Sequence, residues 1–187
     1  MINISEIDEK ELASLCADGN SAARKELYSR YAARLSSFCS RYSNGPIEGT
    51  DIMHDTMIRA LQKIHQFRYQ GRGSLYSWLT RIAVNMAIDR LRKDNKLEVS
   101  ALGEEMSNVV IPEIDEVRHI PLPVLQQFIS RLPDSNRIVF NMFCIDGFSH
   151  KEIAEILGIR EKTSSSSLAK AKKMLANMIK AYYENNR

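Results

Sequence analysis

The amino-acid sequence predicts an all-α protein: two small helical domains, residues 1–97 and 121–187, joined by a flexible acidic linker over 98–120. Apolar residues recur at the three- and four-residue spacing of helices along most of the chain, and no stretch alternates with the two-residue period of a strand. Between residues 98 and 123 this periodicity fades. Gly103, three prolines and six acidic residues there indicate a linker.

The first half of the N-terminal domain is predicted to form two helices. Leucines and aromatic residues recur in steps of three and four over residues 9–41, and the polar run Asp18-Gly19-Asn20 interrupts them. A second break, Asn44-Gly45-Pro46, ends this helical pair.

Two more helices are predicted in the same domain. One spans residues 51–65, with Asp51 in its first turn, where a carboxylate suits the helix dipole. A glycine-rich loop over 69–73 follows, and the other helix spans 75–93 with Ser74 as its N-cap.

The C-terminal domain is predicted to contain a helix-turn-helix between Phe148 and Leu175. Ser149 and Glu152 form a capping box that begins the first helix, and Gly158 stands where that short helix must reverse. The second helix carries an inward apolar stripe of Leu168, Ala171, Leu175 and Met178. Because the second helix of this motif enters the major groove, DNA binding is the favoured function.

Composition narrows the class of protein further. A hydrophobic content of 44% fits a globular chain, and no apolar run approaches the roughly 20 residues that a bilayer span requires. The N-terminus lacks the apolar segment of a secretory signal. We therefore expect a cytoplasmic protein without membrane insertion, with Cys16, Cys39 and Cys144 as buried thiols rather than a zinc site or disulfides.

The net charge of +3 is unevenly distributed. Seven basic and two acidic residues give 67–96 a net +5, and eight basic and four acidic residues give 149–187 a net +4. One basic and six acidic residues give 97–120 a net −5. A basic run is usually a solvated helix face, but two basic blocks on segments with other DNA-binding features favour phosphate contacts.

One enzymatic alternative is an HD-type metal-dependent phosphohydrolase, because His54-Asp55 follows Asp51 by one helical turn. Such a site needs further His and Asp ligands from other helices. The remaining histidines are poorly placed for this, because they lie at a helix end, in the linker and at a helix start: His65, His119 and His150. We therefore expect no metal, no cofactor and no catalytic site.

The segment 67–96 combines aromatic, glycine and basic residues in a pattern typical of single-strand binding. One side of its helix carries, at steps of four, four and three, Arg81, Asn85, Asp89 and Arg92. Arg81, Asn85 and Arg92 suit a nucleic-acid backbone or base edge, and the loop suits an unstacked base. Trp78 is expected mainly in the core, whereas Tyr69 and Tyr76 suit packing and stacking equally.

The run from Asp51 to Lys93 resembles the second conserved region of bacterial sigma factors of the extracytoplasmic-function (ECF) group. An acidic-start helix, an aromatic glycine loop and the pattern RIA-x-N-x-x-x-D-x-x-R follow one another. The pattern LP-x-x-x-R-x-VF-x-x-x-x-x-x-G-FS-x-x-EIAE-x-LGI is similar to the fourth region of the same group. The two resemblances cover roughly residues 12–182, and they imply a dissociable promoter-specificity subunit of RNA polymerase that acts by binding.

The resemblance implies three binding surfaces. One would dock on the clamp-helix coiled coil of core RNA polymerase: Asp51, His54, Asp55 and Arg59. One would bind the melted minus-ten element, with a flipped base in the loop: Tyr69, Gln70, Arg72, Ser74, Arg81, Asn85, Asp89 and Arg92. One would bind the duplex minus-thirty-five element: Lys162, Thr163, Ser165, Ser166, Ala169, Lys170, Lys172 and Lys173. The acidic linker would thread toward the RNA exit path.

The chain departs from the group in its serine run. The positions of Ser165 and Ser167 often carry Arg or Lys there, and serine cannot recognise guanine through two bonds as arginine does. We therefore expect minus-thirty-five affinity to depend on Lys162, Lys170 and Lys172.

Two further questions stay open at this point. The group often uses an anti-sigma factor, and the residues around Met142, Phe143 and Phe148 are a candidate docking face, although core packing explains them better. A stand-alone helix-turn-helix regulator is the alternative function. It predicts a ligand pocket or phosphoacceptor site in residues 1–96, which the sequence does not indicate.

Overall fold

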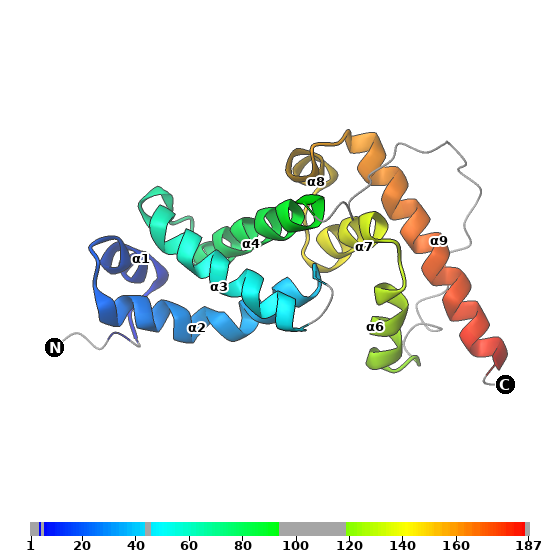
Figure 1. Cartoon of the computed structure of the whole chain (residues 1–187), viewed down its shortest axis with the longest axis horizontal. Coiled ribbons are helices and arrows are strands. Elements are labelled where there is room, and N and C mark those ends of the chain that lie inside the picture. The colour runs from blue at the N-terminus through cyan, green and yellow to red at the C-terminus, as the bar shows by residue number, and fades with distance from the viewer. Residues whose placement is uncertain (1–3, 5, 44–45, 94–118, 186–187) are drawn as a thin grey trace. The chain divides into compact units, whose positions relative to one another are not determined.

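Every element in the described part of the chain is helical, which confirms the predicted all-α class (Figure 1). The structure, a computed structural model, describes residues 4, 6–43, 46–93 and 119–185. The chain forms two compact units, an N-terminal unit (Met1–Asp94) and a C-terminal unit (Asn95–Arg187). The linker expected over 98–120 lies outside the described residues apart from its last two.

The N-terminal unit is built from α1 (Glu9–Ala17), α2 (Ser21–Ser40), α3 (Pro46–Lys63), the 3₁₀ turn η1 (Ile64–Gln66) and α4 (Ser74–Lys93). Helix α2 packs against the other three helices. The predicted break between α1 and α2 is confirmed. Gly19 there adopts a left-handed φ of +83°, and the Asn20 side chain accepts a hydrogen bond of 3.0 Å from the amide of Ala23.

One face of α4 holds it in the core of this unit. Leu75 and Leu79 are fully buried, and Ile88 and Leu91 are at most 2% exposed. Burying a leucine or isoleucine side chain contributes about 1.5–3 kcal/mol, so this stripe fixes the helix firmly. The opposite face of α4 is thereby left exposed at the surface of the unit.

Helix α3 begins earlier than the sequence predicted. It starts at Pro46 rather than Asp51, because a proline is tolerated at the first helical position, where the missing N–H would have no partner within the helix. Asp51 consequently lies beyond the first turn, and Glu48 is the acidic residue of that turn.

Helices α2 and α3 approach each other closely at Gly49. A Cβ atom added there would lie 2.7 Å from the Cα atom of Ser40 and 2.5 Å from its Oγ atom. Only a residue without a side chain fits this crossing.

The C-terminal unit contains α6 (Leu122–Ser130), α7 (Asp134–Phe140), the π-helical turn η2 (Asn141–Ile145), α8 (His150–Leu157) and α9 (Glu161–Asn185). One core cluster joins the segment before α6 to the far end of α9: Ile120, Phe128 and Ile179, with Val124, Leu125, Leu175, Met178, Tyr182 and Tyr183 packed against them. Ile120 is 5% exposed, so the residue just before the predicted boundary is already part of this core.

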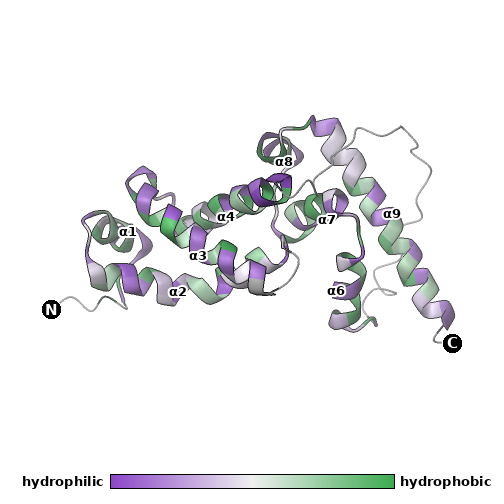
Figure 2. Cartoon of the chain, in the orientation of Figure 1, coloured by the Kyte–Doolittle hydropathy of each residue, from purple (hydrophilic) through white to green (hydrophobic). Residues whose placement is uncertain are grey.

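Polar and apolar residues are interleaved along the helices (Figure 2). None of the helices in the described ranges is long and apolar enough to cross a membrane. Cys16 and Cys39 are buried as predicted, but Cys144 is exposed, because it lies on the outer side of the π-helical turn.

Candidate nucleic-acid interface

The helix-turn-helix has the local geometry that its sequence predicts. The Ser149 side chain accepts a hydrogen bond of 3.3 Å from the Glu152 amide, and the Glu152 carboxylate accepts one of 3.0 Å from the Ser149 amide. Gly158 ends α8 with a left-handed φ of +64°. These two signals are local in sequence, which is why they could be predicted correctly.

Two serines of the serine run face inward, and one of them joins α9 to α8. Ser164 is fully buried, and its hydroxyl lies 2.9 Å from Nδ1 of His150 at the start of α8. Ser167 is also buried. Position 167 therefore faces the inside of the motif, whereas Ser165 is exposed.

The outer face of α9 is a single polar stripe of exposed residues at helical spacing, which we call the α9 stripe: Lys162, Ser165, Ser166, Ala169, Lys170 and Lys173. Thr163 and Lys172, the other two predicted residues, are half-buried at its two edges. All eight predicted residues thus lie on or beside one surface of α9.

The loop before α4 depends on two left-handed glycines. Gly71 has a φ of +109° and Gly73 a φ of +90°. Ser74 is the first residue of α4 and not its N-cap, so that prediction is wrong. Its hydroxyl oxygen instead accepts a hydrogen bond of 3.2 Å from the Gln70 amide and closes the loop.

Tyr69 is the exposed aromatic residue of this loop, at 41% exposure. Tyr76, by contrast, is half-buried against Tyr31, with ring centroids 6.3 Å apart, and the Arg34 guanidinium lies 3.7 Å from its ring centroid. Trp78 is half-buried and packs against the buried Phe67 with ring centroids 5.6 Å apart, so it lies at the edge of the core and only partly meets the expectation of a core role.

The four predicted residues of α4 share its exposed face: Arg81, Asn85, Asp89 and Arg92. The side-chain Nδ2 atom of Asn85 donates a hydrogen bond of 2.9 Å to the backbone carbonyl of Arg81. The Arg92 guanidinium lies 3.6 Å from the Asp89 carboxylate. Asp89 therefore offsets part of the positive charge and holds the arginine along the helix.

The predicted residues of α3 also form an exposed row: Asp51, His54, Asp55 and Arg59. Ile58, beside them, is an apolar side chain that is 57% exposed. The His54 ring stacks on Tyr28 of α2 with an interplanar angle of 11°, and its Nε2 atom lies 3.0 Å from the tyrosine hydroxyl.

A groove of about 700 Å³ runs between α3 and α4. Asp55 and Arg59 line it from α3, and Asn85 and Asp89 line it from α4. Two sets of residues that were predicted separately, one for polymerase and one for the minus-ten element, therefore meet at one groove.

Known protein families match both units. Residues 27–97 match the family described as Sigma-70 region 2, and residues 123–175 match the family described as Sigma-70, region 4. The ECF RNA polymerase sigma factor SigW of Bacillus subtilis (strain 168) is 31% identical over 174 residues, which cover 87% of this chain and 91% of SigW. The chain belongs to the ECF RNA polymerase sigma factors.

Other relatives agree with this assignment. The ECF RNA polymerase sigma factor SigM of Mycobacterium tuberculosis (strain ATCC 25618 / H37Rv) is 28% identical over 175 residues, covering 93% of this chain and 86% of SigM. The sigma factor RpoE from Bartonella quintana, solved in complex with the anti-sigma factor NepR, is similar with a TM-score of 0.56 and 22% identity, covering 83% of this chain and 96% of that one. That similarity shows a shared fold.

Three contacting residues of this sigma factor were not predicted from its sequence. Tyr28 stacks on His54, Tyr31 packs against Tyr76, and the Glu9 carboxylate bonds to the loop before α4. Each contact joins residues far apart in the chain, so no local spacing signals it.

The three apolar residues considered as a protein-docking face differ in burial. Met142 is fully buried, which confirms its expected core role, and Phe148 is half-buried. Phe143 is 36% exposed and stacks on the His150 ring with centroids 4.4 Å apart.

Proposed function

We propose that this sigma factor brings core RNA polymerase to promoters with a minus-thirty-five and a minus-ten element, and holds the minus-ten element once its strands separate. The proposal places its site of action in the cytoplasm, with its polymerase. It acts by binding and is not itself a catalyst. One observation carries the proposal: regions 2 and 4 occupy separate units, and each unit exposes a polar face on the helix that the sequence predicted for DNA.

The α9 stripe is proposed to bind the minus-thirty-five element as duplex DNA. Lys162 and Lys170 supply charge for phosphates, and Lys172 lies at the edge of the same surface. The short hydroxyls of Ser165 and Ser166 suit base edges or phosphates at close range but lack the reach of arginine. We therefore propose that lysine–phosphate contacts supply most of the affinity here.

Salt dependence tests this assignment. The affinity of the chain for a minus-thirty-five duplex is measured at several salt concentrations, and log affinity falls as log salt rises. In Lys170→Ala this fall should be less steep by about 1, because one phosphate contact is lost. Lys180→Ala is the matched control: Lys180 lies on the same helix, 4.0 Å from Glu184 and beyond the stripe, and the slope should not change. Equal slopes in Lys170→Ala and the unmodified chain would contradict the proposal.

The loop and exposed face of α4 are proposed to hold the melted minus-ten element. Tyr69 offers an exposed ring for stacking an unpaired base, a contact that contributes about 1–3 kcal/mol per base in single-strand binders. Gln70 and Arg72 are exposed residues of the same loop, and Ser74 begins the helix that follows it. Arg81 and Arg92 lie farther along the exposed face of α4 and supply positive charge for the strand's phosphates.

The exposed row on α3 is proposed to bind core polymerase. Its mixture of carboxylates, a guanidinium and the exposed Ile58 has the composition of a protein interface with an apolar centre and a polar rim. The stacked pair of Tyr28 and His54 extends this surface onto α2.

A stand-alone regulator with the same helix-turn-helix is the competing function, and polymerase distinguishes the two. A sigma factor is expected to retard a promoter fragment strongly only when core polymerase is present, because the two elements are then bound together. Arg59→Ala should weaken this dependence without changing binding of the chain alone to a minus-thirty-five duplex. Tight binding that is indifferent to polymerase would favour the regulator.

An anti-sigma factor is proposed as a further partner. RpoE of Bartonella quintana was solved with such a protein, NepR. In the present chain, Phe143 and Ile145, which is 47% exposed, are the apolar residues of the π-helical turn open to a partner. Phe143→Ser should weaken such a complex and leave the core of the unit intact.

A further inference from the structure

We propose that Glu9 is a positioning residue for minus-ten recognition: from α1, its carboxylate caps the start of α4 and fixes the loop that carries Tyr69. This inference rests on the proposed role of that loop in binding the melted element.

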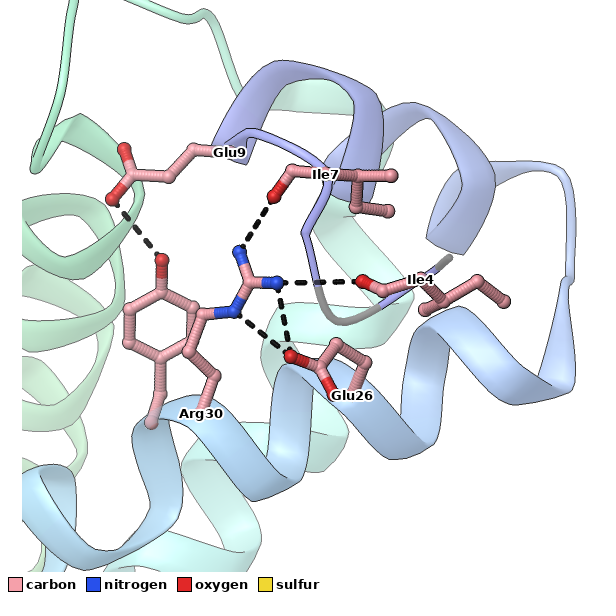
Figure 3. Close-up of polar contacts among 6 residues, drawn as sticks. Ile4, Ile7, Glu9, Glu26 and Arg30 are labelled. Carbon is pink, nitrogen blue, oxygen red and sulfur yellow. Dashed lines mark hydrogen bonds and ion pairs between the residues drawn. The ribbon is translucent and has the colours of Figure 1, made fainter. Parts of the chain in front are cut away.

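The contacts of Glu9 carry the proposal. Its Oε2 atom accepts hydrogen bonds from two backbone amides at the start of α4: that of Gly73, the residue before the helix, at 3.0 Å, and that of Leu75, in its first turn, at 3.1 Å. Its Oε1 atom accepts a hydrogen bond of 3.1 Å from the Tyr31 hydroxyl, drawn as the dashed line from Glu9 in Figure 3. Both carboxylate oxygens are therefore engaged.

A carboxylate at this position supplies what the local sequence of α4 lacks. The first amides of a helix have no partners within the helix, and a side chain just before the helix normally accepts from them. Gly73 stands at that place and has no side chain, and the Ser74 hydroxyl is used by Gln70. The negative charge of Glu9 also opposes the positive end of the helix dipole.

The carboxylate is itself held in place from α2. Tyr31 is 7% exposed, and its ring packs against Tyr76 of α4. Burial, with the Glu9 charge as a second cause, raises the pKa of Tyr31 to about 12, so the phenol stays protonated and donates to Glu9.

The segment before α1 is tied to α2 as well. The Arg30 guanidinium donates to the Ile7 carbonyl at 3.0 Å and to the Ile4 carbonyl at 3.5 Å, and it pairs with Glu26 at 2.9 Å (Figure 3). These bonds fix the entry into α1 and with it the position of Glu9. Helix α1 thus reaches the loop through one carboxylate whose own partners are ordered.

The Glu9 contacts restrict the loop before α4, which contains two left-handed glycines. Gly71 and Gly73 allow many backbone conformations, and a loop of this kind loses binding energy to ordering unless something fixes it beforehand. With the Gly73 and Leu75 amides fixed by Glu9, the Tyr69 ring is presented to a base in one arrangement.

Amide hydrogen exchange on the full chain tests the contact itself. Glu9→Ala should speed exchange at Gly73 and Leu75 on the order of tenfold, because the cap is lost, with no change at Val84 in the middle of α4. Glu11→Ala is the matched control, since Glu11 is an exposed acid in the same turn of α1, and exchange should stay at the wild-type rate.

A second variant guards against a folding defect in Glu9→Ala. Glu9→Gln keeps the shape and one acceptor oxygen but loses the charge, so exchange at the same two amides should rise about threefold. Unchanged exchange at Gly73 and Leu75 in either variant overturns the proposal.

A double-mutant cycle links the contact to binding. The probe is a fluorescent twelve-nucleotide oligothymidylate bound to the complex of the chain with core polymerase. Tyr69→Ala should weaken binding on the order of tenfold in the wild-type background and by less than about twofold in the Glu9→Ala background, because the ring is no longer positioned. Equal losses in both backgrounds overturn the positioning role.

The cycle also separates this inference from the proposed function. If Tyr69→Ala has no effect in the wild-type background, the proposed role of the loop fails, and the positioning proposal fails with it. If Tyr69→Ala weakens binding equally with and without Glu9, the loop assignment holds and the role of Glu9 alone is refuted.

Discussion

Burial decides which of the three cysteine side chains can react. Cys16 is fully buried and Cys39 is 1% exposed, whereas Cys144 is exposed on the π-helical turn. Burial raises the pKa of all three thiols, most strongly that of Cys39, to about 12. Because the thiolate is the reactive form, a buried thiol with a raised pKa is protected twice.

Thiol labelling tests this difference. The folded chain at pH 8 should react rapidly with Ellman's reagent at Cys144, and Cys16 and Cys39 should react only in denaturant. Cys144→Ser should abolish the rapid phase. A rapid phase that survives this substitution would mean that the core around α2 opens readily.

The same raised pKa values predict a loss of stability in alkali. Below pH 9 the Cys39 thiol is protonated in both folded and unfolded chains, so it has no effect on the pH dependence there. Between pH 9 and about 12 the unfolded chain releases the proton and the folded chain retains it, so the free energy of unfolding falls as pH rises.

Urea unfolding at pH 8 and pH 11 measures this effect. The decrease in the free energy of unfolding should be smaller in Cys39→Ala than in the unmodified chain, by about 2 kcal/mol. Cys144→Ala is the comparison and should change the decrease less, because burial raises the pKa of Cys144 less than that of Cys39. An identical decrease in Cys39→Ala would show that the thiol is not protected by folding.

At the scale of elements, the tightest constraint is the crossing of α2 and α3. A methyl group at Gly49 would meet the backbone of Ser40, and a backbone cannot move aside as a flexible side chain can. Gly49→Ala should therefore lower the free energy of unfolding by about 1–3 kcal/mol, despite the better helix propensity of alanine.

Thermal unfolding of Gly49→Ala measures this loss. Ala60→Gly is a useful comparison, because Ala60 is a buried alanine on the same helix. Replacing it by glycine should also destabilise the folded chain, since glycine has the poorer helix propensity. If Gly49→Ala were as stable as the unmodified chain, the two helices would not be in the contact described.

The elements that sequence reasoning predicted well carry local signals. The capping box of Ser149 and Glu152 and the reversal at Gly158 each lie within a few residues, so chain geometry alone specifies them. The early start of α3 at Pro46 was missed because a proline after glycine indicates a break as readily as a first helical position.

Among the residues of the candidate site, too, some were predictable from local spacing and others were not. Helical spacing placed Arg81, Asn85 and the α9 stripe on exposed faces, because periodicity directly reports a face. It could not find Glu9, whose partners are 64 and 66 residues away, or the inward position of Ser167, which depends on where α8 crosses α9. Tertiary contacts supply the information that spacing lacks.

For the whole molecule, the central feature is the division of binding between two units. Each exposes a modest surface: the α9 stripe has three lysines among its six residues, and the α4 face has two arginines, one of them paired with Asp89. Neither is expected to hold promoter DNA tightly alone. When both units are bound to one polymerase, DNA contact by the first unit makes contact by the second effectively intramolecular. The binding energies of the two surfaces then add.

Transcription with purified components tests this account most directly. Core RNA polymerase is mixed with fragments of the genome that encodes the chain, with and without the chain, and the RNA start sites are mapped. The account predicts discrete start sites that appear only with the chain, and that weaken in both Tyr69→Ala and Lys170→Ala. Start sites that are the same with and without the chain would contradict it.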